Sequence, residues 1–114
     1  MIQLELPEPP RANRWWRKFK NRMVLSDEAR AYKETVCLIA LANRCKPYVG
    51  EICISLVWYR GRRSGDLDKR IGILLDALQG TAYENDSQIA AIRAERKYDK
   101  DRPRVFVQVY SYEG

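Results

Sequence analysis

The stretch from Glu51 to Tyr59 reads Glu-Ile-Cys-Ile-Ser-Leu-Val-Trp-Tyr, and it decides the fold. Every second residue from Ile52 to Trp58 is large and apolar, which is the period of a β-strand with one buried face. A basic loop at 60–65 follows, and after it the apolar residues recur at helical spacing. These residues are Leu67, Ile71, Leu74, Leu75 and Leu78. The stretch therefore predicts a strand, a loop and a helix that packs on the sheet.

The flanking sequence supplies the remaining elements. Alternating or β-rich runs predict strands, and Ser26 is a favourable N-cap for a helix. The predicted segments are a strand at 2–6, a helix at 27–43, and strands at 88–98 and 104–112. Because only a turn separates the last two strands, we expect them to pair as a hairpin.

The order β-α-β-α-β-β predicts an α+β fold, with a mixed sheet and two helices packed on one face. The chain has 114 residues, which is enough for one hydrophobic core and too short for two. We therefore expect a single domain over residues 1–114.

The composition excludes several chemistries. The chain contains no histidine, and its three cysteines, Cys37, Cys45 and Cys53, form no C-x-x-C pair. A Cys/His zinc site, a Ser-His-Asp triad and a Cys-His dyad are therefore not expected, and we interpret the cysteines as reduced and structural. The sequence has neither a membrane-spanning apolar run nor a secretory signal, so a cytoplasmic protein without a membrane partner is expected.

Positive charge is concentrated in two segments. The net charge of +6 favours a polyanionic partner such as nucleic acid. Residues 11–22 contain six cations and no acid, and the loop at 60–65 contains three arginines. The predicted nucleic-acid contacts are Arg11, Arg14, Arg17, Lys18, Arg60, Arg62, Arg63, Lys69 and Arg70. Trp15 and Trp16 either stack on unpaired bases or belong to the core, whereas the mixed charges at 93–104 are interpreted as a solvated hairpin.

Three aspartates are the candidate catalytic residues and metal ligands. Asp66 and Asp68 lie where the basic loop enters the helix, and Asp86 follows the same helix. If the helix packs on the sheet, both segments can approach one end of it, where clustered carboxylates need a cation to neutralise them. Mg²⁺ suits such a site because it takes oxygen ligands. The alternative is that an aspartate such as Asp68 caps the helix and complements its dipole.

Several segments, taken in order, resemble the RusA family of Holliday junction resolvases. They are Pro9-Pro10-Arg11-Ala12-Asn13-Arg14-Trp15-Trp16, Leu25-Ser26-Asp27-Glu28-Ala29-Arg30-Ala31-Tyr32, Gly65-Asp66-Leu67-Asp68, Leu74-Leu75-Asp76-Ala77-Leu78 and Tyr83-Glu84-Asn85-Asp86-Ser87-Gln88-Ile89. The resemblance extends over roughly residues 5–110. The ordered combination is far more specific than any single motif.

The resemblance implies a homodimeric, Mg²⁺-dependent endonuclease, often encoded by phages or prophages. Such enzymes resolve Holliday junctions and other branched DNA by paired phosphodiester hydrolysis. By position, Asp66 and Asp68 match the D-x-D pair of the family, and Asp86 matches its third aspartate. Mn²⁺ is expected to substitute for Mg²⁺, and no small-molecule cofactor is expected.

Two positions depart from the family pattern. Lys69 stands where an asparagine is usual, and Gly72 stands where the family carries a catalytic lysine. On a helix, Lys69, Gly72 and Asp76 share a face, and the side chain of Lys69 projects towards the aspartates. We interpret Lys69, assisted by Arg70, as supplying the missing charge. The alternatives are that Lys69 is an ordinary surface lysine, that the protein is a junction-binding module with weakened or lost catalysis, and that the substrate is structured RNA.

Overall fold

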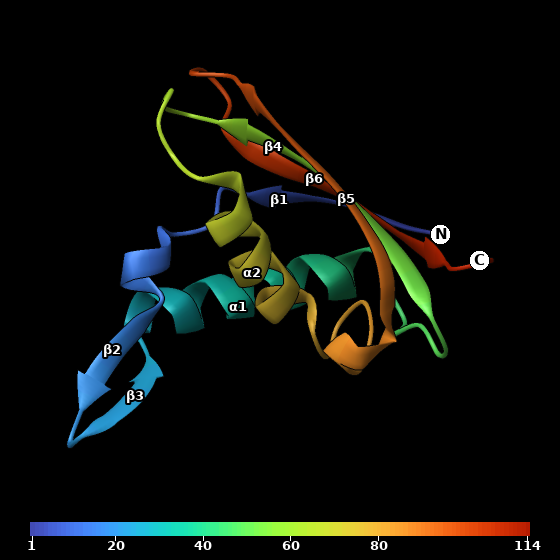
Figure 1. Cartoon of the computed structure of the whole chain (residues 1–114), viewed down its shortest axis with the longest axis horizontal. Helices are drawn as coiled ribbons and strands as arrows, with labels where there is room; N and C mark the ends of the chain where they lie inside the picture. The colour runs from blue at the N-terminus through green and yellow to red at the C-terminus, as the bar shows by residue number, and fades with distance from the viewer.

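A four-stranded mixed sheet with two helices on one face forms the body of the protein (Figure 1). The computed structural model describes residues 1–114. The sheet contains β1 (Ile2–Pro7), β4 (Ile52–Arg60), β5 (Ile89–Tyr98) and β6 (Arg104–Ser111), in the order β1-β6-β4-β5. The helices are α1 (Asp27–Ala42) and α2 (Leu67–Leu78), and two short 3₁₀ turns are η1 (Ala12–Arg14) and η2 (Asp86–Gln88). The predicted α+β fold is confirmed.

Alternation of side chains along the strands creates the core. Leu4, Val107 and Leu56 are register partners across β1, β6 and β4, and all three are buried. Since successive residues of a strand point to opposite faces, the whole apolar set lies on the face that the helices cover. Trp58 belongs to the same set and is 1% exposed, so it places an indole ring at the end of β4.

The predicted hairpin of the last two strands is wrong. β5 pairs in parallel with β4, and β6 pairs antiparallel with the other edge of β4, so β4 lies between them. The helix α2 connects β4 to β5, so the three elements form a β-α-β crossover unit. The other edge of β4 remains free in this unit, and β6 pairs there. Short sequence separation between β5 and β6 therefore did not determine their pairing.

A second, two-stranded sheet was not predicted. The strands β2 (Trp16–Phe19) and β3 (Arg22–Leu25) pair antiparallel and project from the body beside the start of α1 (Figure 1). Lys20 and Asn21 form the two-residue turn with φ of 47° and 62°, which is typical of tight hairpins. Asn21 is a common residue in this conformation but Lys20 is not, so the turn signal in the sequence is weak.

The helix α1 confirms the prediction at 27–43 to within one residue. Its N-cap is Ser26, whose hydroxyl oxygen accepts a hydrogen bond from the Ala29 N–H at 3.0 Å. The same hydroxyl donates to the Arg14 carbonyl, and the Ser26 N–H donates to the Trp15 carbonyl at 2.9 Å. Ser26 thus begins the helix and closes the base of the β2–β3 hairpin. Neither helix is long and apolar enough to span a bilayer.

Replacing Ser26 with alanine should lower the free energy of unfolding by about 1 kcal/mol, because the cap and the bond to the hairpin base are both lost. Thr35→Ala is the matched control, since the Thr35 hydroxyl donates only to the Ala31 carbonyl on the exposed face of α1. Urea unfolding of both variants measures the difference. Equal stability of the two variants would contradict the role assigned to Ser26.

Candidate functional site

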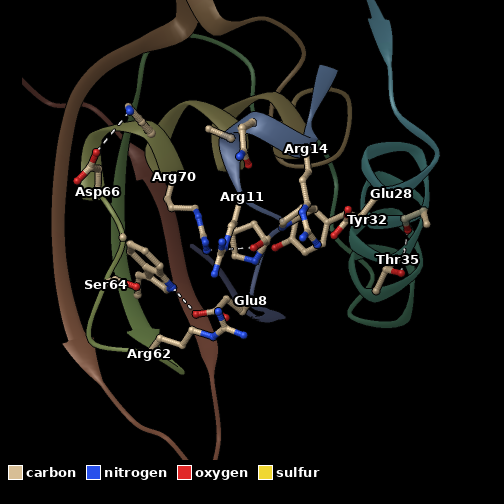
Figure 2. Close-up of a pocket in the computed structure, with 18 residues that line it drawn as sticks. Glu8, Arg11, Arg14, Glu28, Tyr32, Thr35, Arg62, Ser64, Asp66 and Arg70 are labelled. Atoms are coloured by element: carbon tan, nitrogen blue, oxygen red, sulfur yellow. Dashed lines mark hydrogen bonds and ion pairs between the residues drawn. The ribbon is translucent and has the colours of Figure 1, made fainter. Parts of the chain in front are cut away.

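A basic cleft opens between η1, the first half of α1 and the loop that precedes α2 (Figure 2). Its volume is about 1140 Å³. The charged lining residues are the cations Arg11, Arg14, Arg62, Lys69 and Arg70 and the acids Glu8, Glu28 and Asp66. Five positive charges against three negative ones leave the cleft with a formal charge of +2. Such a cleft favours an anionic ligand.

The buried side chain of Trp58 contacts several residues of this cleft. Its indole N–H donates to the Glu8 carboxylate at 2.9 Å, and the Arg70 guanidinium lies 4.5 Å from the centre of its ring. Gly65 passes so close to the ring that a Cβ there would lie 2.8 Å from Trp58 Cη2. One buried ring therefore determines the positions of an acid, a cation and the loop that leads to Asp66.

The loop at 60–65 is held by hydrogen bonds from three sides. The Gly61 N–H donates to the Glu8 carboxylate at 3.1 Å, and Arg60 donates to the Arg63 carbonyl at 2.8 Å. From β5, Arg96 donates to the Gly65 carbonyl at 2.9 Å. Arg96 is therefore not the ordinary solvated charge that the sequence suggested. These hydrogen bonds within the protein preorganise the loop.

Arg70 is the most constrained cation of the cleft. Its guanidinium donates to the Pro9 carbonyl at 3.0 Å while it stacks on Trp58. Partial burial lowers the pKa of Arg70, and the carboxylate of Glu8 acts in the opposite direction. An arginine keeps its charge under such a shift, so Arg70 presents a fixed positive charge to the cleft, with Arg11 beside it (Figure 2).

The D-x-D aspartates lie at the first turn of α2 and face two different hollows. Asp66 directly precedes the helix, but its side chain makes no capping hydrogen bond. Its carboxylate lies 3.5 Å from the ammonium of Lys69 at the rim of the basic cleft, so Lys69 projects towards Asp66. Asp68 lines a second hollow of about 480 Å³, together with Trp16 and Gly72.

Asp86 lies at the other end of α2. Gln79 is the residue after the helix, and its side-chain amide faces the Asp86 carboxylate. With the NH₂ group oriented towards Asp86, it donates to both carboxylate oxygens, at 2.9 and 3.1 Å. Burial raises the pKa of Tyr83, and the neighbouring Asp86 carboxylate raises it further. A helix of 12 residues spans about 18 Å. No three acidic or cysteine side chains of the chain surround a point where a metal could bind.

The expected convergence of Asp66, Asp68 and Asp86 within one chain is therefore wrong. The helix α2 separates the two groups because the segment after it does not return along the helix to its first turn. Asp66 and Asp68 remain two carboxylates near a cationic cleft. A Mg²⁺ ion can use one or two protein carboxylates and complete its shell with water and phosphate oxygens, but the three-aspartate set is incomplete in a single chain.

The other predicted nucleic-acid contacts divide into two groups. Arg17 and Lys18 lie on β2 and are exposed. The side chains of Arg60 and Arg63 make contacts within the protein. Arg60 donates to the Arg63 carbonyl, and the Arg63 guanidinium lies 4.4 Å from the centre of the Tyr98 ring. They position the loop, and Arg62 is the loop arginine that lines the cleft.

Trp15 and Trp16 resolve into one core residue and one surface residue. Trp15 is 2% exposed, and its indole N–H donates to the Asp76 carboxylate of α2 at 3.0 Å. Trp16 is 49% exposed and lines the hollow that contains Asp68. Trp15 ends the 3₁₀ turn η1 in the α conformation, whereas Trp16 begins the exposed strand β2, so the backbone directs the two side chains differently.

Sequence reasoning missed Glu8, Trp58 and Arg96 as parts of the site. Trp58 was recognised only as a core residue, and Glu8 is a single acid beside a proline pair, without a motif of its own. The one available signal is that Glu8 lies shortly before the basic segment at 11–22, separated from it by Pro9 and Pro10. An isolated acid at that position is suited to orient the cations around it.

A comparison with known families agrees with this geometry. The sequence model described as Endodeoxyribonuclease RusA matches residues 7–110. The chain belongs to the RusA family of endodeoxyribonucleases. No curated protein gave a significant match. RusA membership makes nuclease activity the expected class of chemistry. Within this RusA chain, the basic cleft with Asp66 at its rim and Asp68 in the adjoining hollow are the features suited to phosphodiester substrates.

Replacing Gly65 with alanine should disrupt the site more than a glycine change elsewhere. Gly65 has φ of +119°, and the added Cβ would meet the rigid, buried ring of Trp58. Gly50→Ala is the control, because Gly50 has φ of +83° but open space around it. Backbone strain should cost each variant about 1 kcal/mol, and overpacking should cost Gly65→Ala roughly 1–3 kcal/mol more. Urea unfolding tests this, and equal losses would refute the contact between Gly65 and Trp58 as a constraint.

Proposed function

We propose that the protein is a Mg²⁺-dependent, structure-selective endonuclease that cleaves four-way junctions and other branched DNA. The observation that carries this proposal is the placement of Asp66 and Lys69 at the rim of a preorganised cationic cleft in a chain of the RusA family. Cations held in fixed positions bind the phosphate backbone without reading its sequence. A substrate recognised by its shape is consistent with such a surface.

The residues of the cleft would divide the work as follows. Arg11, Arg62 and Arg70 bind phosphates that flank the cleaved bond, and Glu8 keeps two of the elements that carry them in place through Trp58 and Gly61. Lys69 offers its ammonium beside Asp66, where it can stabilise charge on a phosphate. Arg70 is held in place before DNA arrives by its bond to the Pro9 carbonyl and its stacking on Trp58, so little ordering of this cation is required on binding.

We further propose that a homodimer completes the carboxylate set. Asp66 and Asp68 lie at one end of α2 and Asp86 at the other. A two-fold axis that crosses α2 would place two copies of the helix side by side in opposite directions, and would bring Asp86 of the partner subunit towards Asp66 and Asp68. Two equivalent sites related by two-fold symmetry also match the approximate symmetry of a four-way junction.

The surface beside α2 has the apolar character that such a contact needs. Leu67, Ile71 and Leu75 recur along the helix and are only partly buried by the core. On the adjacent edge strand β5, Ile92 is 45% exposed and is the register partner of the buried Ile54, so it points to the helix side of the sheet. An apolar strip of this kind is suited to burial against a second copy.

Subunit mixing tests the shared site. Asp66→Asn combined with Asp68→Asn should reduce junction cleavage roughly a hundredfold or more, and Asp86→Asn should do the same, because metal-dependent charge stabilisation is worth several kcal/mol. Mixing the two variants after subunit exchange should restore nicking of one strand without paired cleavage, since each mixed dimer holds one complete site. If exchange is verified by native mass spectrometry and the mixture stays inactive, the shared site is excluded.

A second candidate function is a junction-binding module with weakened catalysis. The observation that favours it is Gly72, which stands at the position of the family lysine and provides neither charge nor hydrogen bond. A Cβ at Gly72 would meet nothing within 4 Å. A lysine is therefore sterically possible at this position, and lack of space does not explain why the chain has glycine there.

Variants at Gly72 and Lys69 separate the two functions. If the protein is an active nuclease that uses Lys69, Lys69→Ala should reduce junction nicking at saturating Mg²⁺ by about tenfold, as the loss of one stabilising charge implies. If it is a binding module, the unmodified protein should bind without nicking, and Gly72→Lys should introduce nicking. Gly72→Ala is the control, and should leave nicking unchanged while stabilising α2 by about 1 kcal/mol. Unchanged nicking in Lys69→Ala would remove Lys69 from the mechanism.

A further inference from the structure

The β2–β3 hairpin exposes large apolar side chains on a ribbon that nothing in the chain covers. Phe19 is 45% exposed and Met23 is 62% exposed, and Trp16 at the base of β2 is also exposed. A two-stranded ribbon has too little core of its own to hide such residues. Because successive residues of a strand point to opposite faces, Trp16 and Met23 lie on one face of the ribbon and Phe19 on the other. Apolar side chains exposed on both faces mark the hairpin as a surface for a partner.

The charges on the hairpin identify the chemistry of that partner. Residues 16–25 of the hairpin contain four cations and no acid. Around Phe19, the Arg17 guanidinium lies 5.5 Å and the Lys20 ammonium 5.4 Å from the ring centre. A protein partner rarely offers dense negative charge beside flat apolar surfaces, whereas unpaired nucleotides offer both phosphates and exposed base faces.

The hairpin is fixed at its base and so can direct its side chains. Trp15 is buried, and its indole N–H donates to Asp76 on α2, while Ser26 closes the strands where α1 begins. Both ends of the hairpin are therefore tied to helices that carry or border the candidate site. The tight turn at Lys20 and Asn21 keeps the strands in register.

Trp16 connects the hairpin to the carboxylates. It lines the same hollow as Asp68, Lys69 and Gly72, and this hollow adjoins the basic cleft, since Lys69 lines both. A DNA base that leaves the duplex at a branch point could stack on the Trp16 ring while the phosphate of the same nucleotide remains near Asp68. Stacking on an aromatic ring does not depend on the identity of the base.

We propose that the β2–β3 hairpin is a base-stacking arm that receives unpaired nucleotides of branched DNA, with Trp16 beside the carboxylates and Phe19 near the tip. This inference rests on the proposed function. It assigns selectivity for branched over continuous DNA to the hairpin, and assigns general affinity for phosphates to the cleft.

The test compares the affinities of variants for a four-way junction and for a continuous duplex of equal length, measured by fluorescence anisotropy in EDTA to prevent cleavage. Trp16→Ala and Phe19→Ala should each weaken junction binding by about tenfold and leave duplex binding nearly unchanged, because only the junction offers unpaired bases. Trp16→Phe should retain most of the junction affinity. A 2-aminopurine base at the branch point should show a fluorescence change on binding that Trp16→Ala reduces.

Two control variants separate stacking from charge and from general damage. Lys18→Ala removes charge from the same strand, and should weaken junction and duplex binding by the same factor. Tyr112→Ala removes a similarly exposed aromatic residue, 41% exposed, near the C-terminal end of the chain, and should change neither affinity. Thermal unfolding of each variant confirms that the fold is retained.

The outcomes distinguish this inference from the proposed function. If the unmodified protein prefers and cleaves junctions but Trp16→Ala and Phe19→Ala keep the same preference, the arm is refuted and the endonuclease stands. If both variants lose junction and duplex affinity equally, the hairpin contributes general binding and the arm is again refuted. A change of oligomeric state in either variant would show instead that the hairpin contacts a second copy. If the unmodified protein shows neither junction preference nor cleavage, the proposed function itself fails.

Discussion

The hydrogen bond between the Trp58 indole and the Glu8 carboxylate is the interaction on which the site depends. Trp58 is a core residue of β4, and an indole N–H that is removed from water must find an acceptor inside the protein. Glu8 provides it, and the same carboxylate accepts the Gly61 N–H, so the chain after β1 and the loop after β4 meet at one point. Arg70 stacks above, and Gly65 crosses the ring. A residue of the hydrophobic core therefore positions the residues that line the cationic cleft.

The helix α2 determines how the acidic residues are used. It carries Asp66 and Asp68 at its start, holds Asp76 against Trp15 in its last turns, and places Asp86 beyond its end. A rigid helix cannot bring its two ends together, so the acids of one chain remain apart. The proposed two-fold dimer would unite them, because a two-fold axis reverses the direction of the helix. Assembly and catalysis would then depend on each other.

Several elements could be predicted from residue periodicity alone. The strand at 52–60 and the helix at 67–78 have clean periods, and Ser26 provides a clear cap for α1, so these elements form where expected. The pairing of β5 with β4 could not be predicted, because it follows from the crossover through α2 and not from sequence distance. The β2–β3 hairpin was missed because its turn has an unusual lysine at positive φ.

The sequence by itself determined the fold class, the basic character of the surface and the identity of the acidic residues, because these follow from local periodicity, charge and motif spacing. Only the tertiary structure decided that Glu8 and Arg96 support the site, that Trp15 is buried while Trp16 is exposed, and that Asp86 lies far from Asp66. The physical reason is that such relations depend on the direction in which a packed helix or strand carries its side chains. Motif spacing measures distance along the chain, and a rigid helix between two motifs turns that spacing into separation in space.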